Sequence, residues 1–138
     1  MNKDMPLDNL GQMSVNDLSE CVEAGLNAGA YAIAQAGLAL REIQRRGEYP
    51  TTFEAFVKDK FALTRARAYQ LMYAADIIAD LASVFESNKL PRSESAVRPM
   101  IGLTKQQRIE VWRRALKGKQ RSPGYGTVKA IVEQMQAS

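Results

Sequence analysis

The amino-acid sequence predicts an all-α fold, and three observations lead to this prediction. Every periodic apolar segment follows helical spacing, and none alternates as a strand does. Hydrophobic residues make up 46% of the 138 residues, which is enough to form a core and argues against a disordered chain. Hydroxyl side chains that can cap helices precede the apolar segments, at Ser14, Thr51, Thr64, Thr104 and Thr127. We therefore expect one multi-helix domain with a helical N-terminal extension.

The N-terminal third is expected to form a tail and a helical segment. Residues 1–13 lack a periodic pattern and are predicted to be a flexible tail. Ser14 is placed to cap the segment of residues 14–47, which forms either one long helix or two helices broken near Gly25 or Gly29. Small residues in this segment allow another helix to pack closely, either within the molecule or across the seam of a dimer. The residues alone leave both explanations open.

Charge is unevenly distributed along the chain. Residues 1–35 hold one basic and five acidic side chains, a net charge of −4, whereas residues 36–138 have a net charge of +8. A basic body attracts phosphates by releasing counterions, and an acidic end avoids nucleic acid and is freer to meet protein. We expect the basic part to contact a phosphate-bearing partner, and any protein partner to bind the acidic N-terminal helix.

Residues 51–72 have the pattern of a helix-turn-helix. Thr51 and Glu54 have the spacing of a capping box, so the first helix is expected to begin one residue after Thr51. A break at residues 61–63 separates it from a second helix, which Thr64 is placed to cap. The second helix buries its apolar face, continues to about residue 84, and turns outward Arg65, Tyr69 and Gln70.

Three further helices are expected after this motif. The first covers about residues 94–101, begins at Ser93 or Ser95, and is interrupted by Pro99. Thr104 caps the next helix, with Gln107 completing a capping box, and Trp112 lies on its apolar side as the expected core anchor. Thr127 is placed to cap the last helix.

The absence of histidine and the single cysteine exclude several classes of protein. They remove Ser-His and Cys-His nucleophile pairs and the common zinc ligands. We therefore expect no enzyme, no metal and no cofactor. Cys21 falls in an apolar helical pattern and is expected to be a small buried hydrophobe. No apolar stretch approaches the roughly 20 residues that span a bilayer, so we expect a cytoplasmic protein without a membrane partner. Binding to DNA would make it nucleoid-associated.

Two long stretches of the chain resemble known DNA-binding proteins. Residues 53–78, FEAFVKDKFALTRARAYQLMYAADII, resemble a helix-turn-helix motif that recurs in phage, plasmid and other mobile-element proteins. Residues 91–116, PRSESAVRPMIGLTKQQRIEVWRRAL, resemble the two helices that follow it in those proteins. The order of these elements is similar to the central DNA-binding domain of ParB/KorB-type partition proteins. Residues 1–46 are too few for the nucleotide-binding domain that ParB proteins carry there, so we expect no nucleotide switch.

The resemblance implies which side chains meet DNA. It places in or beside the recognition surface Thr64, Arg65, Arg67, Tyr69 and Gln70. It also implies that the segment from Ser93 to Arg98, which includes Ser95, supports or adds to the contact. Arginine suits guanine and glutamine suits adenine, so Arg65 and Gln70 are expected to read base edges. Phosphate contacts are expected from Thr64, Arg67, Tyr69, Arg98, Lys119 and Arg121.

These observations favour a sequence-specific binder of double-stranded DNA. Residues 48–138 would be its helix-turn-helix DNA-binding domain, and residues 14–47 would support a homodimer. We expect a transcriptional repressor of a phage, plasmid or other mobile element, and the alternative is a plasmid partition or replication accessory protein. Ala62 lies where such turns usually have glycine, and Lys58 where the first helix usually has a small residue. These departures keep open a third interpretation, a helical protein-interaction module or inhibitor without specific DNA binding.

Overall fold

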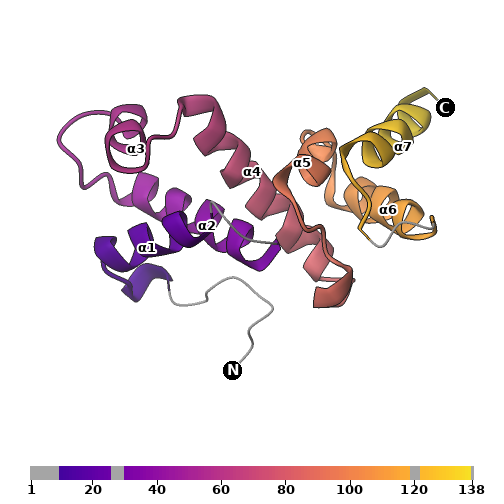
Figure 1. The fold of residues 1–138 in the computed structure, drawn as a ribbon, viewed down its shortest axis with the longest axis horizontal. Helices are drawn as coiled ribbons and strands as arrows, with labels where there is room; N and C mark the ends of the chain where they lie inside the picture. Colours follow the sequence, from indigo (N-terminus) through magenta and orange to yellow (C-terminus); the bar gives the residue numbers. More distant parts are fainter. Residues whose placement is uncertain (1–9, 26–29, 119–121, 138) are drawn as a thin grey trace.

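The computed structural model describes residues 10–25, 30–118 and 122–137, which form seven α-helices and no strand (Figure 1). The prediction of an all-α fold is confirmed. The α-helices are α1 (Val15–Gly25), α2 (Ala30–Arg46), α3 (Phe53–Phe61), α4 (Arg65–Ala82), α5 (Glu94–Val97), α6 (Lys105–Leu116) and α7 (Tyr125–Ala137). Short 3-10 helices cover Leu10–Gln12, Ser87–Lys89 and Arg98–Met100.

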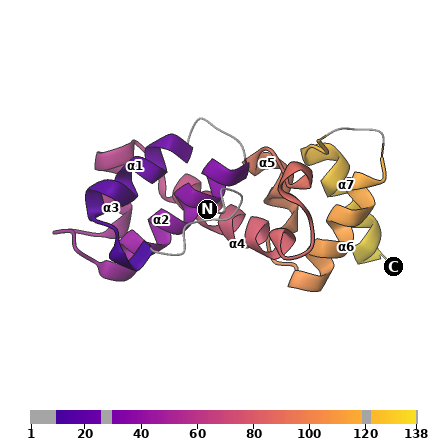
Figure 2. The same cartoon turned by 90° about the horizontal axis from the view of Figure 1, so that it is seen from below.

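Helix α4 links the two ends of an elongated molecule. Figures 1 and 2 show α1, α2 and α3 at one end and α5, α6 and α7 at the other, with α4 running between them. α2 and α6 both pack against α4, and α1 packs against α2. One cluster of buried apolar side chains extends from Leu18 in α1 through Leu71 in α4 to Val132 in α7. The N-terminal helices therefore share a core with the rest of the described chain.

The N-terminal segment forms two helices rather than one long helix, which agrees with one of the two interpretations of the sequence. Ser14 begins α1: its Oγ accepts a hydrogen bond from the backbone N–H of Asp17 at 3.0 Å. α2 approaches α4 so closely that a methyl group at Gly37 would overlap the carbonyl oxygen of Leu71 and lie 2.6 Å from Cβ of Ala75. Close packing within the molecule therefore explains why residue 37 is a glycine. A dimer formed through this segment stays a prediction.

The helix starts follow the sequence predictions at four caps and differ at two. Thr104 and Gln107 form both bonds of the predicted capping box. Thr52 caps α3 in place of Thr51, because the Thr52 hydroxyl accepts a hydrogen bond from the N–H of Ala55 at 3.1 Å. Thr127 lies inside α7 rather than before it, since the helix begins at Tyr125.

Two predicted core residues have different outcomes. Trp112 is fully buried, and its Nε1 donates a hydrogen bond to the carbonyl oxygen of Lys89 at 2.7 Å, so its prediction as a core anchor is confirmed. Cys21 is only half-buried and packs at the edge of the core, where burial raises the pKa of its thiol. The helix expected over residues 94–101 is interrupted near Pro99 as predicted, since it is divided into α5 and a 3-10 helix that contains Pro99. Proline lacks the N–H that a continuing α-helix would use.

Candidate nucleic-acid interface

A three-residue turn joins α3 to α4. Ala62 has the left-handed conformation, with φ 57° and ψ 33°, and its N–H donates to the carbonyl oxygen of Lys58 at 3.0 Å. The N–H of Leu63 donates to the carbonyl oxygen of Val57 at 3.2 Å, while the Leu63 side chain is buried. These bonds satisfy carbonyl groups that the end of α3 would leave unpaired.

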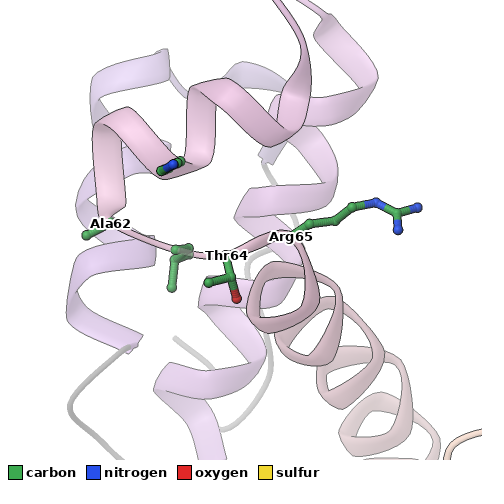
Figure 3. Close-up of a pocket in the computed structure, with 5 residues that line it drawn as sticks. Ala62, Thr64 and Arg65 are labelled. Carbon is green, nitrogen blue, oxygen red and sulfur yellow. The ribbon is translucent and has the colours of Figure 1, made fainter.

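Thr64 begins α4 as predicted. Its backbone is extended, and its Oγ accepts a hydrogen bond from the N–H of Arg67 at 3.1 Å. A shallow hollow of about 470 Å³ lies at this turn and is lined by Lys58, Ala62, Leu63, Thr64 and Arg65 (Figure 3). The capped start of α4 is thus accessible from solvent beside two basic side chains.

Arg65 projects from the first turn of α4 into solvent. Its side chain is 72% exposed, and Figure 3 shows it extending away from the turn. The guanidinium lies 5.2 Å from the centre of the Tyr69 ring, and its Nε lies 3.4 Å from a carboxylate oxygen of Glu54. The Tyr69 ring supports the guanidinium without burying it, so most of its donors remain free for a ligand.

Tyr69 supports this surface from below rather than turning outward as the sequence suggested. The side chain is half-buried, and its ring meets the edge of Phe53 with ring centres 6.1 Å apart. Its hydroxyl accepts a hydrogen bond from Nε2 of Gln44 in α2 at 2.9 Å. Tyr69 therefore acts as the platform on which Arg65 stacks.

The exposed face of α4 has two further members that the sequence predictions did not include. Tyr73 follows Tyr69 by one helical turn and is 42% exposed, with the guanidinium of Arg41 6.0 Å from its ring centre. Ala66 is exposed beside Arg65. The four-residue spacing from Tyr69 to Tyr73 was a sufficient signal for the tyrosine. Gln70, predicted to read a base, is half-buried and makes no side-chain hydrogen bond within the described residues, so its amide is available.

Two of the predicted phosphate contacts are joined by a buried carboxylate. Arg67 in α4 and Arg98 after α5 both form ion pairs with Glu94, whose side chain is only 5% exposed. Burial alone would raise the pKa of Glu94, but hydrogen bonds from Arg98 and Arg67 outweigh this effect and hold the pKa below its usual value. The two arginine side chains remain 39% and 41% exposed. One carboxylate faces two guanidiniums, so this cluster has a net positive charge.

The remaining predicted DNA-contacting residues are Ser93, Ser95, Lys119 and Arg121. Ser93 caps α5: its Oγ accepts a hydrogen bond from the N–H of Ala96 at 3.2 Å and lies 3.2 Å from Oγ of Ser95. The serine pair therefore holds the start of α5 in place beside Glu94. Lys119 and Arg121 lie outside the described residues.

No protein-family model, curated protein or solved structure matches this chain. The resemblance to partition proteins therefore stays an interpretation of the motif. In the part of the chain that the structure describes, no helix is long and apolar enough to cross a membrane. The same residues contain no group of three or more cysteine and carboxylate side chains arranged to hold a metal ion.

Proposed function

We propose that this protein binds double-stranded DNA at specific sequences and acts as a transcriptional regulator, in particular a repressor. The position of Arg65 carries the proposal. This residue lies on the first turn of a long capped helix, and its largely exposed guanidinium stacks on the Tyr69 ring. Helices that read DNA contact base edges with residues near their N-terminus. Arginine at such a position forms two hydrogen bonds with guanine.

The exposed face of α4 offers further groups of the chemistry that DNA recognition uses. Gln70 lies little more than one turn after Arg65 and can bond an adenine edge through its amide. Ala66, with its small side chain, lets the helix approach the bases, and the Thr64 hydroxyl lies where it can also bond a phosphate. Tyr73 extends the same face by another turn.

Phosphate attraction is supported by two features. Residues 36–138 have a net charge of +8, and the pair Arg67 and Arg98 carries one charge more than Glu94 neutralises. In a homodimer, two copies of α4 would lie about 34 Å apart, one turn of duplex DNA, and the site would be an inverted repeat.

The proposal is tested by selecting binding sites from a random duplex pool at about 0.15 M salt, where non-specific attraction is weak. Wild type is expected to enrich one motif. Arg65→Ala should cost about 1–3 kcal/mol of binding free energy and relax the preference at one base pair, and Gln70→Ala should relax another.

Lys105→Ala is the matched control for the lost charge, because Lys105 is exposed at the start of α6. It should leave the motif unchanged. Circular dichroism should show that each variant retains its helix content. A wild-type protein that enriches no motif would refute sequence-specific binding, and it would favour the interpretation as a protein-interaction module. An unchanged ranking of sites with Arg65→Ala would refute its role in reading a base.

A further inference from the structure

We propose that the first turn of α7 is a second DNA-contacting element, in which Tyr125 and Lys129 bind the phosphate backbone beside the segment that α4 reads. This inference rests on the proposed function and adds to it a surface that the sequence did not indicate.

A chain of contacts leads from α4 to this turn. Arg67 in α4 and Arg98 after α5 meet at Glu94. Arg98 donates hydrogen bonds to Glu94 at 2.9 and 2.6 Å, and Tyr125 lies near Arg98. α7 packs against both α5 and the 3-10 helix that holds Arg98. Figure 1 shows α5 between the first half of α4 and α7 along the upper edge of the molecule.

Tyr125 and Lys129 are available for a ligand. They lie four residues apart on one face of α7, and Nζ of Lys129 is 5.8 Å from the centre of the Tyr125 ring. The tyrosine is 43% exposed, and within the described residues no carboxylate forms an ion pair with the lysine. Lysine at an exposed position serves as a point charge for phosphate, and a tyrosine hydroxyl can donate a further hydrogen bond to it.

The surface fits the DNA backbone rather than base edges. Glu133 follows Lys129 by one turn and is exposed, so the basic character ends after the first turn of α7. A contact limited to one turn reaches one or two phosphates. Because α7 packs against the 3-10 helix that holds Arg98, this turn lies beside the positive cluster of Arg67 and Arg98 and would extend the contact made by α4 along the same duplex.

The test compares Lys129→Gln with Lys105→Gln on the motif that wild type selects. Both variants remove one exposed positive charge, but Lys105 lies near the other end of α4, since Arg108 one turn later pairs with Asp80 at 2.9 Å. Lys129→Gln should weaken binding roughly ten-fold. It should also make the negative slope of log affinity against log salt less steep by about one, with no change in the preferred sequence. Lys105→Gln should change neither quantity.

A hydroxyl-radical footprint provides a second readout. The double variant Tyr125→Ala, Lys129→Gln should lose protection on one flank of the site and keep it over the motif. If wild type binds its motif while Lys129→Gln behaves as Lys105→Gln does and the footprint is unchanged, the role of α7 is refuted and the proposed function stands. If wild type binds no DNA sequence specifically, both proposals are refuted.

Discussion

Replacing Ala62 with glycine should stabilise the protein. Ala62 has φ 57°, and it is the one non-glycine residue with a positive φ in the described part of the chain. Its side chain is exposed, so removing the methyl group takes away little packing. Its backbone bond to Lys58 does not depend on the side chain and would be kept by Ala62→Gly.

The expected gain is the difference between two opposing terms. The left-handed conformation costs a residue with a Cβ about 1–2 kcal/mol, and glycine escapes this cost. Glycine also gives the unfolded chain more freedom, which takes back about 0.4–1 kcal/mol. Ala62→Gly should therefore raise the free energy of unfolding by about 0.5–1 kcal/mol. For a chain of this length the melting temperature should rise by about 2–4 °C.

Urea unfolding followed by circular dichroism measures this change. Ala130→Gly is the matched control, because Ala130 is exposed in the middle of α7. There the same chemical change should lower the free energy of unfolding by about 0.5–1 kcal/mol, since glycine disfavours a helix interior. If Ala62→Gly destabilises the protein as Ala130→Gly does, Ala62 does not have the left-handed conformation and the turn differs from the one described.

Three further perturbations test other parts of the structure. Glu54→Gln removes a carboxylate 3.4 Å from Nε of Arg65, so DNA should bind about two- to three-fold more tightly in a titration, and weaker binding would count against the proposed interface. Gly37→Ala should lower the free energy of unfolding in urea by about 1–3 kcal/mol because the methyl group overlaps α4, whereas Gly126→Ala, where the space is open, should not lower it. Hydrogen bonds from two neighbouring arginines lower the pKa of Glu42 to about 2, so its stabilising effect is present above pH 4.5 and is lost as the pH falls towards 2. Glu42→Gln should therefore flatten the dependence of unfolding free energy on pH in that window, and a dependence equal to that of wild type would show that the ion pairs are absent in solution.

The features that sequence predicted well depend on residues close together in the chain. The caps formed by Ser14, Thr64 and Thr104 each join residues three apart, so spacing alone reveals them. The prediction that Thr51 caps α3 was wrong. Thr51 and Thr52 both precede this helix, and only the backbone conformation determines which of them caps it.

The prediction that Thr127 caps α7 was wrong for a different reason. There the carbonyl oxygen of Gly124 accepts the N–H of Val128 at 3.1 Å, and a backbone acceptor leaves no mark in the amino-acid sequence. A hydroxyl residue two positions inside the helix, Thr127, therefore resembled a cap.

Features that join distant residues could not be predicted. Tyr69 was expected to face outward, but Gln44, 25 residues earlier, holds its hydroxyl. Arg67 was expected to be free for phosphate, and Glu94, 27 residues later, pairs with it. Local periodicity reports which face of a helix is apolar, whereas the partner of a polar side chain on the flank of that face depends on how whole helices pack.

The pairing of Arg67 and Arg98 with Glu94 is physically compatible with the phosphate contacts that the sequence suggested. One guanidinium would be enough to neutralise the buried carboxylate, yet two are present and each stays about two-fifths exposed. A free arginine side chain loses rotamer entropy when it grips a phosphate, and that loss weakens binding. Here Glu94 has already restricted both side chains, so the excess positive charge is presented in a fixed position where α4 begins. An ion pair that stabilises the fold is for this reason also a means of preparing the interface that we propose.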